Sequence, residues 1–233
     1  MLKFIFLVGR TLIDEANFYA YIDSRLLFLL NQFGAKIDFR NYNAIKEDII
    51  KNRKVVDGGI VELVIQICRV LMPEGYEKII LRYLLPSIEF AEKHFVYLRD
   101  DAIRTLEILC QYFKIGIIAN QDKKILKILE FHDLDKNFHS CILSFGSNTE
   151  HDKEILGMVL EMMKKRATEC IMIDDRLDRY MQHANILGMI TIRLNSIFNL
   201  QEPLTQNEIP KFTLNNLMEL VNIQSKMRLD QVK

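Results

Sequence analysis

The chain has 233 residues, 49% of them hydrophobic, and its Lys+Arg and Asp+Glu totals are equal at 31 each. This length suits one core domain with an inserted subdomain, and the apolar content is enough to fill a sizeable core. The formal net charge of zero argues against a nucleic-acid binder that works by neutralising phosphates.

The cysteines and the apolar runs indicate a compartment. The four cysteines lie far apart without a C-x-x-C motif, each inside an apolar stretch, which predicts buried free thiols in a reducing environment. The apolar run from Phe4 to Val8 is too short for a signal peptide, and no later run reaches the ~18 residues of a membrane span. We therefore expect a cytoplasmic protein without membrane or nucleic-acid partners.

Two kinds of pattern occupy the first hundred residues. The segment from Leu2 to Val8 is apolar except for Lys3 and is closed by Gly9, which predicts a buried parallel strand. From about Asp14 to Phe95, apolar residues recur at helical spacing and are interrupted by Gly and Pro. This stretch predicts four or five helices and no strand.

After Leu98 the pattern alternates between short apolar runs and helical stretches. The runs predict strands at 114–119, 140–144, 170–173 and 190–194. Helices are expected at 101–113, 122–131, 152–166 and 179–187, and a loop at 199–211 precedes a last helix.

Strand–helix alternation predicts a parallel sheet with helices on both faces. The N-terminal strand joins this sheet, and we expect it to run through the centre with Leu7 buried beneath a cap. The predicted fold is therefore α/β. A Rossmann-like core domain is formed by residues 1–14 and 96–233, and an all-helical cap is inserted at residues 15–95.

Ligands of such sheets bind at the carboxyl ends of the strands. The segments at those ends, taken in order, resemble the haloacid dehalogenase superfamily with a helical cap. The most specific pieces are I-I-A-N-Q at 117–121, D-R-L-D at 175–178 and L-G-M-I-T-I-R at 187–193. The resemblance covers nearly the whole chain and implies phosphoryl transfer through an aspartyl-phosphate, with Mg²⁺ between the carboxylates and the phosphate.

The resemblance puts the nucleophilic aspartate at Leu7, which cannot attack phosphorus or bind a metal ion. The second acid falls on Gly9 and the Ser/Thr donor on Ala119, and both departures are common in this branch of the superfamily. An adjoining glycine falls on Arg10, a bulky cation. The catalytic lysine falls on Glu150, which we expect to be a solvated loop acid; Lys153, three residues on, is a candidate to take the place of that lysine.

The metal-binding motif is half retained. Its first aspartate is Asp175, preceded by Asp174 in place of a glycine, and its second falls on Tyr180, preceded by Arg179 in place of an asparagine. If a residual metal site survives, Asp174 and Asp175 are its ligands and Mg²⁺ is its ion; the sequence establishes no cofactor. The positions that match the superfamily are Thr11, Leu12, Asp14, Asn120, Asp152, Arg176 and Asp178.

The ligand-binding candidates that follow are Gly9, Arg10, Thr11, Asn120 and Arg176. For Arg176 a structural role is the alternative, through pairing with Asp178 or a loop carbonyl.

Three functions remain open. The first is a hydrolase-like protein that has lost phosphatase activity and acts as a binding, regulatory or scaffold module for an unknown small molecule or protein. The second is a divergent hydrolase of a small phosphorylated or halogenated substrate that uses Asp175, Asp174 or Asp14. The third is a subunit that joins a larger complex through its cap.

Overall fold

The computed structural model describes residues 3–7, 11–56, 59–119, 128, 130–134, 138–143 and 149–223. The chain divides into two compact units. The first comprises Met1–Asp14, Tyr97–Asn199 and Pro203–Lys233, and the second comprises Glu15–Val96 with Leu200–Glu202. Each unit is described by itself.

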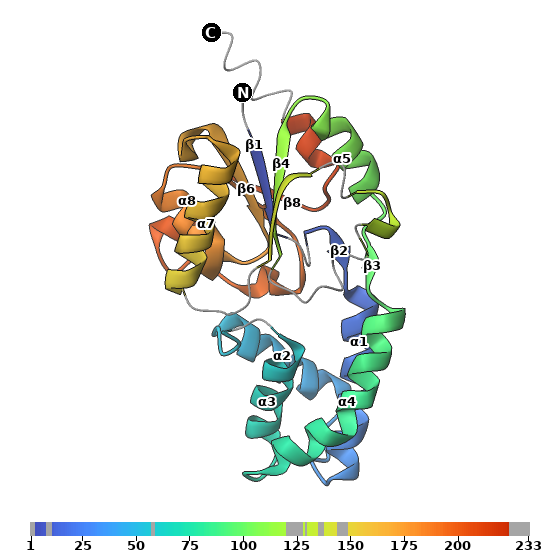
Figure 1. Cartoon of the computed structure of the whole chain (residues 1–233). Helices are drawn as coiled ribbons and strands as arrows, with labels where there is room; N and C mark the ends of the chain where they lie inside the picture. Colours follow the sequence, from blue (N-terminus) through green and yellow to red (C-terminus); the bar gives the residue numbers. More distant parts are fainter. Residues whose placement is uncertain are drawn as a thin grey trace. The chain divides into compact units, whose positions relative to one another are not determined.

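The first unit is built on a six-stranded sheet in the order β5-β4-β1-β6-β7-β8 (Figure 1). Every strand pair in this sheet is parallel. The strands are β1 (Lys3–Leu7), β4 (Lys114–Ala119), β5 (Phe138–Leu143), β6 (Cys170–Asp174), β7 (Ile190–Leu194) and β8 (Phe212–Leu214). The α/β class predicted from the alternating pattern is confirmed.

The central position predicted for the first strand is also confirmed. β1 lies between β4 and β6, with Leu7 opposite Ile118 and Phe6 opposite Ile173. An interior strand of a parallel sheet is covered on both faces, which is why β6 reads as a continuous apolar run and is buried along its whole length. The predicted burial of the Leu7 side chain lies outside the described side chains.

Helices lie on both sides of the sheet, with α7 (Thr149–Met163) and α8 (Gln182–Ile186) on one side and α5 (Ala102–Cys110) on the other (Figure 1). A π-helical turn, η3 (Leu177–Met181), leads into α8. α8 ends shortly before Gly188, which has a left-handed φ of 77°. One apolar face of α7 packs with residues of β4, β6 and η3 in a core cluster that includes Leu156, Val159, Ile118, Met172 and Tyr180.

Three predictions from the sequence are corrected by the structure or fall only partly within the residues that it describes. α7 begins and ends three residues before the predicted helix 152–166. It ends early because Lys164 adopts a left-handed φ of 51°. β8 follows directly on the predicted loop 199–211, where no strand was expected, and pairs with β7. Most of the predicted helix 122–131 lies outside the described residues.

The second unit consists of four helices in its described part: α1 (Ala16–Gln32), α2 (Phe39–Lys51), α3 (Ile60–Leu71) and α4 (Tyr76–His94). As predicted, no strand occurs in the described part of 15–95. The apolar positions at helical spacing form the buried core of this unit, with Ile22, Leu26, Leu30, Tyr42, Ile49, Val64, Ile67, Ile80 and Leu84 almost fully buried. A short antiparallel ribbon of the first unit, β2 (Ile13–Asp14) with β3 (Tyr97–Leu98), brackets the insertion.

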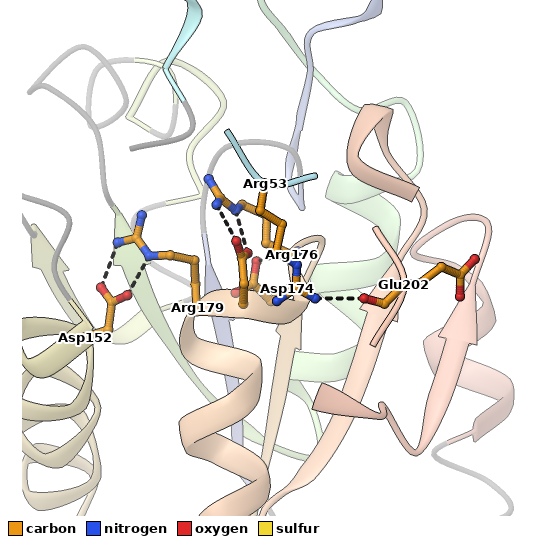
Figure 2. A network of polar contacts seen from close by, with 7 residues as sticks. Arg53, Asp152, Asp174, Arg176, Arg179 and Glu202 are labelled. Atoms are coloured by element: carbon orange, nitrogen blue, oxygen red, sulfur yellow. Dashed lines mark hydrogen bonds and ion pairs between the residues drawn. The ribbon is translucent and has the colours of Figure 1, made fainter. Parts of the chain in front are cut away.

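Polar contacts also hold the helical unit together. The buried hydroxyl of Tyr42 donates a hydrogen bond of 2.7 Å to Asp23, and Lys46 forms an ion pair with the same carboxylate. Burial, followed by the charge of Asp23, raises the pKa of Tyr42. Arg53 Nη2 donates to the backbone carbonyl of Glu202 over 2.8 Å, which attaches residues 200–202 to this unit (Figure 2). Within the described chain, no helix is both long and apolar enough to cross a membrane.

Candidate functional site

The strand β6 ends at Asp174, whose side chain is fully buried at the carboxyl edge of the sheet. Its Oδ1 accepts hydrogen bonds from the backbone N–H groups of Asp175, over 2.7 Å, and of Arg176, over 3.2 Å. The carboxyl group therefore organises the turn that follows the strand, and this accounts for an aspartate at a position where the superfamily keeps a glycine.

Burial raises the pKa of Asp174 well above the usual range of a carboxyl group, and the negative charge of Asp175 acts in the same direction. The backbone N–H of Arg176 opposes the shift without cancelling it. The environment therefore favours the protonated, neutral form of Asp174, because two adjacent carboxylates away from water repel each other.

Arg176 is held by a neighbour in its own turn. Its Nε donates to Asp178 Oδ1 over 3.0 Å and its Nη2 to Asp178 Oδ2 over 2.8 Å. The side chains are only 5% and 16% exposed. Two N–H groups that a bound anion would need thus face Asp178, and the arrangement favours a structural role for this arginine.

A second bidentate pair joins Arg179 to Asp152 in the first turn of α7. Arg179 Nε lies 2.5 Å from Asp152 Oδ2, and Nη2 lies 2.7 Å from Oδ1 (Figure 2). The Asp152 side chain is fully buried and that of Arg179 is 7% exposed. Burial alone acts to lower the pKa of Arg179, but the hydrogen bond and charge of Asp152 raise it above its ordinary value.

Tyr180, which the motif resemblance aligns with the second metal aspartate, is fully buried. It packs in the core cluster with α7 and β6, and the guanidinium carbon of Arg179 lies 5.9 Å from its ring centroid. A neutral phenol and an arginine therefore stand where the superfamily motif supplies an asparagine and a carboxylate.

The described residues do not fit Mg²⁺. This ion requires a near-octahedral set of oxygen ligands, usually including carboxylates. No group of three or more His, Cys, Asp or Glu side chains suited to a metal gathers in the described part of the chain. Asp174 uses Oδ1 on two backbone N–H groups, and the turn that follows carries the buried positive charge of Arg179.

The other candidates from the sequence are placed as follows. Leu7 and Ala119 are the last residues of the neighbouring strands β1 and β4. Thr11 is fully buried, and its Oγ1 has no hydrogen-bond partner in the part of the chain that the structure describes. Gly9, Arg10 and Asn120 lie outside that part.

The expectation that Glu150 lies in a loop is wrong, because it is the second residue of α7. Residues 149–163 form the helix, so residue 150 falls in its first turn. Lys153 is on the same helix and is exposed. Asp14 ends β2 and is also exposed.

The ion pair between Asp152 and Arg179 was missed by sequence reasoning. The two residues are 27 positions apart and lie on different elements, so only the fold brings them together. One signal was available: an arginine replaces an asparagine in a turn that is otherwise buried. A buried arginine requires a nearby carboxylate, and Asp152 is one of the positions that match the superfamily.

No family model matches the chain. Among curated proteins, a glyceraldehyde 3-phosphate phosphatase from Methanocaldococcus jannaschii is 30% identical over 136 residues, which cover 55% of this chain and 57% of that protein. A protein of the same name from Methanopyrus kandleri is 24% identical over 153 residues, covering 61% and 64%. The chain thus matches less than two thirds of the length of these curated relatives.

Solved structures resemble nearly the whole chain. A haloacid dehalogenase-like family hydrolase from Xanthomonas campestris has a TM-score of 0.66 at 12% identity, covering 96% of this chain and 95% of that one. At this identity the likeness defines the fold. The chain therefore has an α/β fold with an inserted helical unit, shared with such hydrolases. This is the fold of haloacid dehalogenase-like hydrolases, as the motifs indicated.

Proposed function

We propose that this chain has lost phosphatase activity and acts as a binding, regulatory or scaffold module. The observation that supports this most strongly is that β1, an interior strand of the sheet, ends on Leu7. The motif alignment puts the nucleophilic aspartate there, and a leucine side chain has no atom that can form an acyl-phosphate.

The size of the loss can be bounded. Removing a covalent nucleophile typically costs about a million-fold in rate. Losing a fixed electrostatic group costs a further few kcal/mol of transition-state stabilisation, on the order of a hundred- to thousand-fold in rate. Both losses apply here, since Glu150 replaces the lysine and Tyr180 replaces a metal carboxylate. The remaining acids do not offset such a deficit.

A second candidate function is a divergent hydrolase of a small phosphorylated substrate. The sequence similarity to two glyceraldehyde 3-phosphate phosphatases favours it. In that case Asp175, which is 3% exposed at the end of β6, is the carboxyl group best placed to take part.

A phosphatase assay decides between these candidates. The purified protein is incubated with an aryl phosphate, and separately with glyceraldehyde 3-phosphate, in the presence of Mg²⁺. We expect no release of phosphate above the buffer rate. Release that persists through repurification, disappears in Asp175→Ala and persists in the exposed control Asp48→Ala would instead establish the hydrolase.

A further inference from the structure

We propose that the guanidinium group of Arg179 supplies the positive charge at the carboxyl edge of the sheet and prevents a divalent metal ion from binding there. This inference extends the proposed function. It depends on the proposed function in one respect: both take the carboxyl edge of the sheet as the functional site. The expectation of residual Mg²⁺ at Asp174 and Asp175 is thereby replaced by a cation that belongs to the chain.

The backbone brings this guanidinium to the edge. Arg179 lies in η3, directly after the turn that carries Asp174 and Asp175, and its backbone leaves the helical conformation with φ −123° and ψ −125°. Figure 2 shows its side chain extending to Asp152, which belongs to α7. The arginine therefore bridges the turn after β6 and the start of a helix on the face of the sheet.

The pairing requires a charged arginine. Asp152 is fully buried, and a carboxylate without water needs a cation and hydrogen-bond donors around it. The planar guanidinium supplies both through two parallel N–H groups, which a lysine cannot match.

The same features oppose a metal ion. A divalent cation that approached Asp174 or Asp175 would be repelled by the fixed charge of Arg179, which lies in the next turn of the chain and is buried like them. Both oxygens of Asp152 are engaged by Arg179. Removing the guanidinium without replacing its charge leaves Asp152 as a buried carboxylate without a counter-ion.

The experiment measures Mn²⁺ binding by electron paramagnetic resonance of the free ion in the wild-type protein and three variants. Arg179→Asn restores the superfamily residue and removes the charge. Arg179→Lys keeps the charge, and Arg166→Asn removes an arginine whose side chain is 84% exposed. We expect no binding at millimolar Mn²⁺ in the wild type, Arg179→Lys or Arg166→Asn. Binding should appear in Arg179→Asn, at least about tenfold tighter than in the wild type.

Two results would overturn the proposal: wild-type binding of Mn²⁺ that is lost in Asp175→Asn, or a folded Arg179→Asn that binds no better than the wild type. Arg179→Gln, which keeps more of the side-chain volume, replaces Arg179→Asn if circular dichroism finds the latter unfolded. The proposed function fails separately. Phosphate release without Mn²⁺ binding contradicts only the loss of activity, and Mn²⁺ binding without phosphate release contradicts only the role of Arg179.

Discussion

The stability that a buried charge contributes or costs depends on its partner. Asp152 and Arg179 are both almost inaccessible to water and form a bidentate pair. Replacing Asp152 with Ala leaves the guanidinium buried without a counter-ion, so we expect the free energy of unfolding to fall by about 3–5 kcal/mol.

Urea unfolding followed by circular dichroism measures this change. The matched control is Asp48→Ala, because Asp48 forms a 3.0 Å ion pair with Lys54 in which the two side chains are 57% and 45% exposed. Water screens such a pair, and the control should lose less than about 1 kcal/mol. Equal losses in the two variants would mean that burial does not distinguish the two pairs.

The raised pKa of Asp174 predicts how stability depends on pH. Because the folded state holds this proton more tightly than the unfolded state, its contribution is complete below the ordinary aspartate pKa of about 4 and is lost as the pH rises toward the folded pKa. Asp174→Asn is neutral at every pH, and its oxygen can still accept the two backbone N–H groups. We therefore expect the variant to gain stability relative to the wild type as the pH rises.

The difference in free energy of unfolding between Asp174→Asn and the wild type should grow by up to about 1.4 kcal/mol per pH unit between about pH 5 and the folded pKa. Urea titrations at several pH values measure it, with the exposed Asp48→Asn as the control. A difference that stays constant with pH would contradict the neutral state assigned to Asp174.

At the scale of elements, the sequence predicted the interior of the sheet better than its margin. β4 and β7 have the predicted bounds, because a short apolar run between polar residues is typical of a strand buried on both faces. β8 was missed because Phe212–Leu214 has no such run, and its strand conformation comes from pairing with β7 at the edge of the sheet. Tertiary pairing of this kind leaves little trace in local sequence.

Capping offers a test at this scale. Asp38 is the N-cap of α2, and its carboxylate accepts a 2.7 Å hydrogen bond from the backbone N–H of Asn41. Asp38→Ala removes the acceptor and should cost about 1 kcal/mol of stability, whereas Asp38→Ser should retain most of the cap. The melting temperatures of the wild type and the two variants measure this ranking of stability. A lower melting temperature for Asp38→Ser than for Asp38→Ala would contradict it.

At the scale of the whole molecule, the division into two units has a consequence for folding. The helical unit is formed almost entirely by one continuous stretch, Glu15–Val96, and has a buried core of its own. A segment with its own hydrophobic core can fold without the rest of the chain. We expect a peptide of residues 15–96 to be helical and to melt cooperatively.

Far-UV circular dichroism of this peptide against temperature is the measurement. Leu26 is 1% exposed, so Leu26→Asp buries an unpaired charge in the core and should abolish the cooperative transition. A peptide that melts gradually, in the same way as its Leu26→Asp variant, would contradict independent folding.

The candidate site was predictable in position but not in its contacts. The motifs located the strand ends, since a parallel sheet brings its carboxyl ends to one edge. The replacements at Leu7, Glu150 and Tyr180 could be recognised by alignment with the superfamily pattern. The pairing of Arg179 with Asp152 could not, because it depends on how η3 and α7 pack in three dimensions.

If phosphatase activity has been lost as proposed, this ion pair also makes that loss hard to reverse during evolution. Arg179→Asn alone leaves the Asp152 carboxylate buried without a counter-ion, which lowers the free energy of unfolding by about 3–5 kcal/mol. Tyr180→Asp alone inserts a charge into an apolar core. Since a domain has only about 5–15 kcal/mol of stability, a lineage that took these steps singly would pass through poorly folded intermediates. In Mg²⁺, the triple variant Leu7→Asp, Arg179→Asn, Tyr180→Asp should therefore lose less free energy of unfolding than the sum of its three single changes predicts. Urea unfolding of the four variants measures this. Additive losses would mean that the pair does not oppose reversal.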